Sequence, residues 1–114
     1  MTHEFKGTIV EESLQDNRIL NDLHIIGVEI SQDENPANRW HMYSVLVTRE
    51  DIERLSVTIK PKWYMHFWKD RDIVAIFQGK QFEFNYDDKS TWAQAVEYGL
   101  SQGIPKEQLD FLID

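Results

Sequence analysis

The chain has 114 residues, a formal net charge of −8 and no cysteine. This length predicts one domain, residues 1–114, and the absence of cysteine excludes disulfides, thiol nucleophiles and thiolate metal sites. The acidic balance argues against general nucleic-acid binding, which requires a basic face. The sequence contains no signal-like N-terminus and no run of about 18 apolar residues. We therefore expect a cytoplasmic protein that does not enter a membrane.

The first half of the chain predicts three strands. Residues 5–11 form the first, and residues 24–31 alternate in the way that a strand requires. Residues 39–47 are rich in aromatic and β-branched side chains and form the third. The segment 13–23 fits either a helical turn or an irregular excursion, and 32–38 is polar, contains a proline and predicts a loop.

A helix follows the third strand. Thr48 is a suitable N-cap and Asp51 completes a capping box. Apolar residues at helical spacing continue as far as Ile59, and Pro61 stops the element.

The second half predicts three consecutive strands and a second helix. The strands are 63–70, 73–78 and 81–86, with short turns between them. Ser90 is the expected cap of a helix over 91–102, which ends at Gly103 in the usual C′ position.

This order of elements predicts a two-layer α+β domain. Its sheet is mostly antiparallel, and its two main helices lie on one face in a ferredoxin-like arrangement. The strand-helix-strand unit of residues 39–70 forms a right-handed crossover, which leaves room for another strand between its two strands.

Two stretches resemble a known group of proteins. "FKGTIVEESL" near the start and "STWAQAVEYGLSQGIPKEQLDF" near the end are similar to small uncharacterised conserved proteins of bacteria and archaea, and "WYMHFWKDRDIVAIFQGKQFEF" is similar more loosely. The resemblance implies a prokaryotic cytoplasmic origin. It carries no activity and no site residue.

Residues 62–70, "KWYMHFWKD", concentrate aromatic side chains in one strand. Alternation places Trp63, Met65 and Phe67 on one face. The other face then carries Tyr64, His66 and Trp68. Residues 39–47 repeat this composition, and we expect the two Trp/Met faces to lie together under the helices, backed by aromatic residues of the last strand (Phe82, Phe84 and Tyr86).

The second sheet face is the predicted functional surface. In a two-layer domain it faces water, yet here it would hold His41 and Tyr43 beside Tyr64, His66 and Trp68, a patch large enough to need a cover. Four covers are open: the chain's own segment 13–23 or C-terminal tail, a second copy in a homodimer, a foreign protein, or a small anionic or aromatic ligand.

We therefore predict a binding or interaction module rather than an enzyme. Between Arg39 and Arg71 the chain has seven basic and four acidic residues, a balance of +3, which suggests a basic rim that includes Lys60 and Arg71. No catalytic residue, metal ligand or cofactor is predicted. The candidate binding residues are Tyr43, Tyr64, His66, Trp68, His41, Lys62 and Lys69.

Two alternative functions remain open. One is a small acid–base enzyme with His66 as general acid or base and Tyr64 or Tyr43 as a second proton donor. The other is an acidic inhibitor or immunity-type protein, in which charge speeds association with a basic partner. The sequence contains no motif that identifies a reaction.

Overall fold

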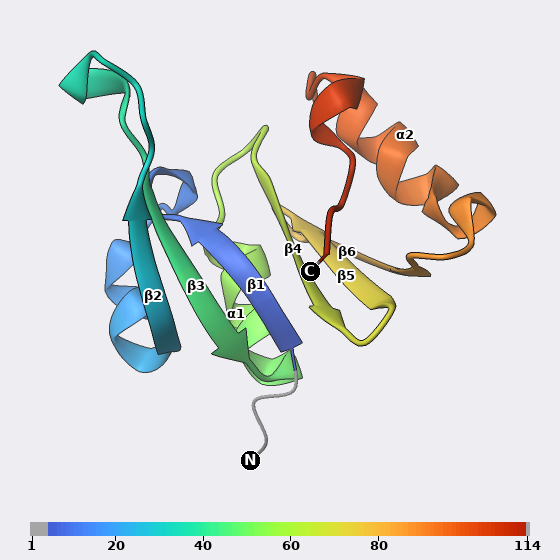
Figure 1. Ribbon diagram of the computed structural model, residues 1–114. Helices are drawn as coiled ribbons and strands as arrows, with labels where there is room; N and C mark the ends of the chain where they lie inside the picture. The colour runs from blue at the N-terminus through green and yellow to red at the C-terminus, as the bar shows by residue number, and fades with distance from the viewer. Residues whose placement is uncertain (1–4, 114) are drawn as a thin grey trace.

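The computed structural model describes residues 5–113, which form a six-stranded sheet and two α-helices (Figure 1). All five neighbouring strand pairs in this part of the chain are antiparallel, in the spatial order β2-β3-β1-β4-β5-β6. The elements are β1 (Phe5–Val10), β2 (His24–Ile30), β3 (His41–Val47), α1 (Arg49–Thr58), β4 (Tyr64–Lys69), β5 (Asp72–Phe77), β6 (Lys80–Asn85) and α2 (Ala93–Ser101). The α+β class is therefore confirmed.

Local sequence signals explain the bounds of both helices. The capping box of α1 is present, because the Thr48 hydroxyl accepts from the Asp51 backbone and the Asp51 carboxylate accepts from Thr48. The start of α2 differs from the prediction. Asp88, not Ser90, caps a short 3₁₀ turn over Lys89–Trp92, and α2 begins after it. Gly103 follows α2 with a φ of 85°, the left-handed conformation that glycine adopts without cost.

The segment between β1 and β2 is the irregular excursion that the sequence left open. It contains two short 3₁₀ turns, Glu11–Ser13 and Asn17–Asp22. Leu14 and Leu20 are buried against α1's side of the sheet, so this segment extends the core.

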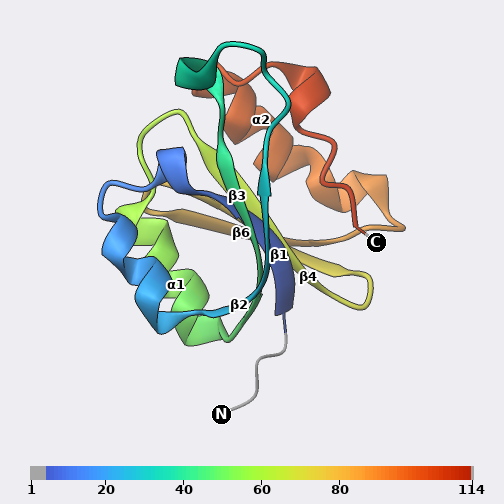
Figure 2. The same ribbon diagram turned by 60° about the vertical axis from the view of Figure 1, so that its left-hand side comes forward.

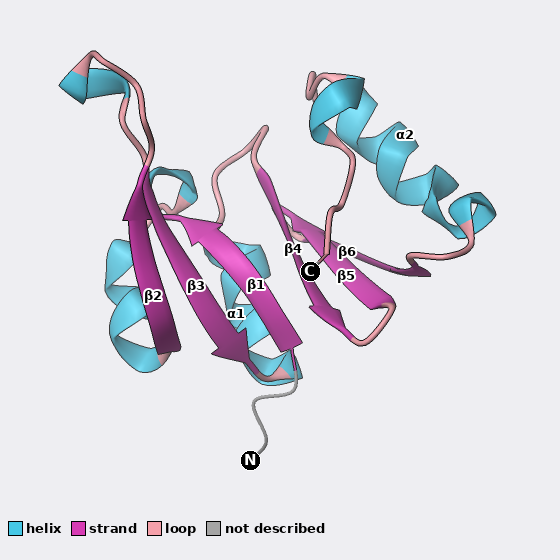
Figure 3. Cartoon of the chain, in the orientation of Figure 1, coloured by secondary structure: helices cyan, strands magenta, loops and turns pink. Residues whose placement is uncertain are grey.

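Two-residue hairpins join β4, β5 and β6 (Figure 3). Lys69 pairs with Asp72, and Phe77 pairs with Lys80. Asp70 (φ 55°) and Gly79 (φ 71°) supply the positive φ that such tight turns require. These turns fix the register, so the face of every side chain in the three strands follows from them.

The two helices pack on opposite faces of the sheet (Figure 2). We call the face beneath α1 the inner face and the face beneath α2 the outer face. Ile52 and Leu55 of α1 contact the inner core with Phe67, whereas Trp92 and Ala95 belong to the outer core. The prediction of two helices on one face is wrong, and the ferredoxin-like relation stays a prediction.

The composition of β5 explains why the sheet needs a covering layer on its outer face as well as on its inner face. Its residues Ile73–Phe77 are all buried, with Val74 and Ile76 in the inner core and the alternate residues in the outer core. A continuous apolar run of this kind is typical of a strand that is covered on both faces.

The outer layer covers only half of the sheet. The outer core takes its sheet residues from β4, β5 and β6, and α2 with the C-terminal segment lies over these strands (Figures 1 and 2). On the outer face of β1, Thr8 is exposed. The strand β1 lies between β3 and β4, as the crossover prediction allowed. No helix among residues 5–113 is both long and apolar enough to span a membrane.

Candidate functional site

The uncovered half of the outer face meets the C-terminal segment at a groove of about 530 Å³. Side chains of β1 and β4 lie on one side of it, and residues 104–112 lie on the other. We call it the aromatic groove. Its lining residues are Thr8, Val10, Trp40, Lys62, Trp63, Tyr64, Met65, His66, Trp68, Ile104, Glu107, Gln108, Asp110 and Leu112.

Strand alternation in β4 supplies the aromatic residues. Gly7 of β1 pairs with Phe67 on the inner face, so Trp68, opposite Lys6, points to the outer face with His66 and Tyr64. The rings of His66 and Trp68 lie with their centroids 5.4 Å apart. The sequence therefore assigned these three residues to one face correctly.

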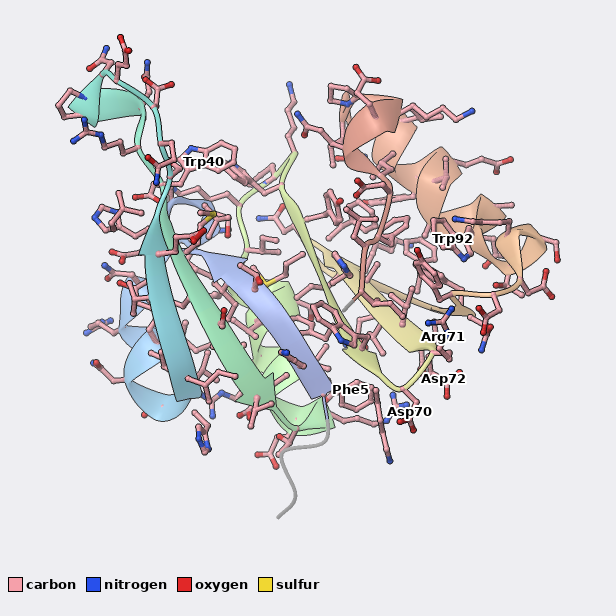
Figure 4. All side chains as sticks on the ribbon, viewed as in Figure 1. Phe5, Trp40, Asp70, Arg71, Asp72 and Trp92 are labelled. Carbon is pink, nitrogen blue, oxygen red and sulfur yellow. The ribbon has the colours of Figure 1, made fainter. Side chains whose placement is uncertain are left out.

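Trp40 lines the groove together with Trp63. The ring of Trp40 lies 5.4 Å from that of Trp63, edge to face, and is 42% exposed. Figure 4 shows Trp40 at the base of the protruding β2–β3 arm (residues 31–40). The prediction that Trp40 lies under the helices is wrong. Val45 and Tyr43 of β3 pair with Gly7 and Ile9 on the inner side, so Met42 and Trp40 belong to the outer side of the sheet.

The C-terminal segment is docked on β4 through two polar contacts. The Tyr64 hydroxyl donates to the Gln108 carbonyl, and His66 Nε2 lies 2.7 Å from the Leu112 carbonyl oxygen, to which it donates. Between these contacts Phe111 is fully buried, with its ring against Tyr64, His66, Phe84 and Trp92. Phe111 has a φ of 44°, a conformation that is held because the ring is anchored.

This cover changes the proton chemistry of both β4 residues. Burial lowers the pKa of His66 below its usual 6.5, although the Leu112 carbonyl and Asp110 oppose the change. Burial, with a contribution from Asp110, raises the pKa of Tyr64 to about 12. His66 is thus neutral at neutral pH, and Tyr64 is a weak proton donor whose hydroxyl is already bonded.

His41 and Tyr43 lie on the opposite, inner side of the sheet. His41 Nδ1 is 2.7 Å from Glu12 Oε2, and the Tyr43 hydroxyl donates to Glu11 at 2.6 Å. The hydrogen bond to Glu12 raises the pKa of His41, and the hydrogen bond to Glu11 raises that of Tyr43. The prediction that these two residues share a face with Tyr64, His66 and Trp68 is wrong.

The basic rim is also dispersed. Among the predicted rim residues, Lys62 lines the groove, whereas Lys69 lines a separate hollow beside Phe5. Arg71 pairs with Asp87 and lies over the Tyr86 ring. Glu107 and Asp110 also line the groove, so the lining contains two carboxylates and one lysine.

The sequence did not assign Thr8, Trp40 or Trp63 to the site, although it offered the C-terminal tail as one possible cover of this face. The side of Trp40 follows from pairing with β1, which the sequence did not provide. The C-terminal segment is part of the cover, since its apolar residues (Ile104, Leu109 and Phe111) are buried in the outer core. Within residues 5–113, no group of three or more His, Asp or Glu is placed to hold a metal ion.

No protein-family model matches the sequence, and it has no match among curated proteins or solved structures. The resemblance to conserved prokaryotic proteins therefore stays a prediction. The chemistry of the groove itself is therefore the basis for a proposed function.

Proposed function

We propose that the chain is a binding module whose aromatic groove takes a flat aromatic ligand. The observation that carries the proposal is the convergence of Trp40, Trp63 and Trp68 on a groove that the chain's own C-terminal segment borders but does not fill. Aromatic rings recognise other rings by stacked and edge-to-face contacts. A mostly apolar hollow with a few polar groups is the usual form of a small-molecule site.

The charge of the lining indicates which aromatic ligands are preferred. The expectation of an anionic ligand rested on a basic rim, but of that rim Lys62 alone contributes to the lining. Glu107 and Asp110 also line the groove, and the faces of tryptophan rings attract cations. A neutral or cationic aromatic compound therefore suits the groove better than an anionic one.

A His66-centred acid–base enzyme is less well supported. Its second proton donor would be Tyr43, which is on the other face, or Tyr64, whose hydroxyl is bonded to Gln108. His66 itself donates to Leu112 beneath the chain's own segment. The inhibitor alternative rests on net charge alone and gains no specific observation.

Three probes with the same ring and different charge test the proposal: indole, indole-3-acetate and tryptamine. Isothermal titration calorimetry of the wild-type chain should detect tryptamine and indole with dissociation constants of millimolar order, as expected for ligands this small. Indole-3-acetate should bind more weakly, because Glu107 and Asp110 repel its carboxylate.

Filling the groove provides the decisive variant. Thr8 is exposed on β1 and lines the groove, so Thr8→Phe should occupy the space and weaken all three probes by about tenfold. Gln81→Phe adds the same ring to an exposed position of β6, outside the groove, and should bind as the wild type does. Equal affinity in the wild type and Thr8→Phe would refute the proposal.

A further inference from the structure

The edge of β2 that faces away from β3 is a second surface with an unusual composition. Of the eight large apolar residues that are exposed among residues 5–113, four lie in this seven-residue strand. They are Ile25 (37% exposed), Ile26 (49%), Val28 (61%) and Ile30 (41%). In residues 5–113, β2 pairs with β3 and with no strand on its other side (Figure 1).

The backbone of β2 offers hydrogen-bonding groups to that open edge. The Ser31 N–H bonds the Trp40 carbonyl, and the register continues unbroken through Glu29–Met42 to Gly27–Ser44. Because bonded and non-bonded pairs alternate in an antiparallel ladder, Val28 and Ile30 direct their N–H and C=O groups away from β3. These groups are free to pair with another strand.

The other edge of the same sheet is protected in the usual way. On β6, Lys80, Gln81 and Glu83 are exposed, and charged or polar residues of this kind discourage strand pairing. In β2, Glu29 is the sole residue with a permanent charge in a chain whose net charge is −8. Two copies of this acidic chain can therefore approach each other along β2 with little repulsion between like charges.

The strand is complementary to itself in an antiparallel arrangement. A register shift between Ile25 and Gly27 leaves His24 and Glu29 on the outer side, opposite Leu46 and Met42. It leaves Ile25 and Val28 on the inner side, opposite Val45 and Tyr43. Pairing Ile25 with Val28 of a second copy also sets His24 opposite Glu29. Apolar then meets apolar on one side, and a histidine meets a carboxylate on the other.

We propose that β2 pairs antiparallel with β2 of a second copy of this chain, so that two six-stranded sheets join into one. The dimer does not involve the aromatic groove and does not depend on its function. An interface built on one strand falls at the small end of specific interfaces, below about 1,200 Å² of buried surface. We therefore expect a reversible dimer with a dissociation constant on the order of 10 µM.

Sedimentation velocity of the full chain, from about 1 µM to about 1 mM, tests the proposal. The wild type should shift from monomer to dimer across this range. Val28→Pro removes one outward N–H without affecting the β2–β3 ladder and should remain monomeric. Val28→Thr retains the N–H and the β-branched shape and should still dimerise. A wild type that stays monomeric throughout, or a Val28→Pro protein that dimerises like the wild type, overturns the proposal.

A charge series separates edge pairing from a general effect of the substitution on folding. Val28→Lys places a cation in the proposed seam and should weaken the dimer at least tenfold, whereas Gln81→Lys adds the same charge on β6 and should not. Circular dichroism and thermal unfolding establish that each variant is folded. Thr8→Phe fills the groove and should dimerise normally, and loss of the dimer in that variant would place the interface on the outer face instead.

Discussion

The ring of Trp40 packs edge-on against the ring of Trp63, with centroids 5.4 Å apart and planes at 64°. Trp40 belongs to the base of the β2–β3 arm and Trp63 directly precedes β4, so the pair connects two segments that β1 separates in the sheet. Both rings of this pair line the aromatic groove.

Trp40→Ala should weaken probe binding with little loss of stability. The side chain is 42% exposed and its main aromatic partner is Trp63, a contact worth about 0.5–1.5 kcal/mol. Chemical denaturation should detect a loss of that size in the free energy of unfolding. Calorimetry should show that the variant binds tryptamine more weakly than the wild type, by a larger proportion than its loss of stability. Trp68→Ala is a poorer test, because Trp68 also packs against the outer core. If Trp40→Ala binds tryptamine as tightly as the wild type does, the Trp40 ring is not part of the binding site.

Gly7→Ala should destabilise the fold at the junction of the two sheet halves. A Cβ at Gly7 would overlap the Phe67 ring and lie 2.8 Å from the His66 carbonyl oxygen. Overpacking of this kind costs about 1–3 kcal/mol, which urea denaturation measures. Gly27→Ala is the matched control, since its Cβ would meet Ser44 at an ordinary 3.8 Å. Equal stability of the two variants would contradict the close β1–β4 approach.

Phe111→Ala should release the C-terminal segment from β4. The ring is fully buried among four aromatic residues, and truncation of such a phenylalanine costs about 3–5 kcal/mol. Hydrogen exchange should show faster exchange over residues 104–113 than in the wild type. Leu112→Ala, at a 61% exposed neighbour, should leave the exchange unchanged. Unchanged protection in Phe111→Ala would show that the ring does not anchor the segment.

Acid should weaken the docking of the same segment. The pKa of His66 is lowered in the folded state, so the unfolded chain binds a proton more readily. The stability that neutral His66 provides is complete above its usual 6.5 and is lost as pH falls through the lowered value. His66→Gln should flatten this acid limb of the free energy of unfolding plotted against pH.

His41→Gln is the control with the opposite sign. The pKa of His41 is raised by Glu12, so its contribution is complete below 6.5 and is lost as pH rises through the raised value. This variant should flatten the curve on the alkaline side of 6.5 and leave in place the acid-side loss that His66 contributes. Identical curves for the two variants would contradict the assignment of the histidines to different environments.

The strands and the first helix could be predicted because their signals are local. Alternation in β4 and the capping box at Thr48 depend on residues close in sequence. The packing of α2 on the outer face was missed although a signal existed. The run "IVAIF" is buried on both faces. The two-residue hairpins pair Ile73 with Trp68 on one side and with Phe84 on the other, so the three side chains lie on the same face. Trp68 and Phe84 therefore need a cover of their own.

The grouping of the site could not be predicted in full because it depends on pairing across the chain. Whether Trp40 or His41 faces the groove is decided by the register of β3 against β1, where a shift by one residue exchanges the faces. Of the predicted binding residues, four line the groove together: Tyr64, His66, Trp68 and Lys62. The other three, His41, Tyr43 and Lys69, lie elsewhere.

The most direct test of the proposed function is a titration of the ¹⁵N-labelled wild-type chain with tryptamine, observed by NMR. We predict saturable shifts of the Thr8 and Val10 amides and of the Trp40 indole N–H, with the amides of β6 unaffected. Shifts centred on another surface, or none at concentrations well above the millimolar range, would contradict the assignment of the aromatic groove as the binding site.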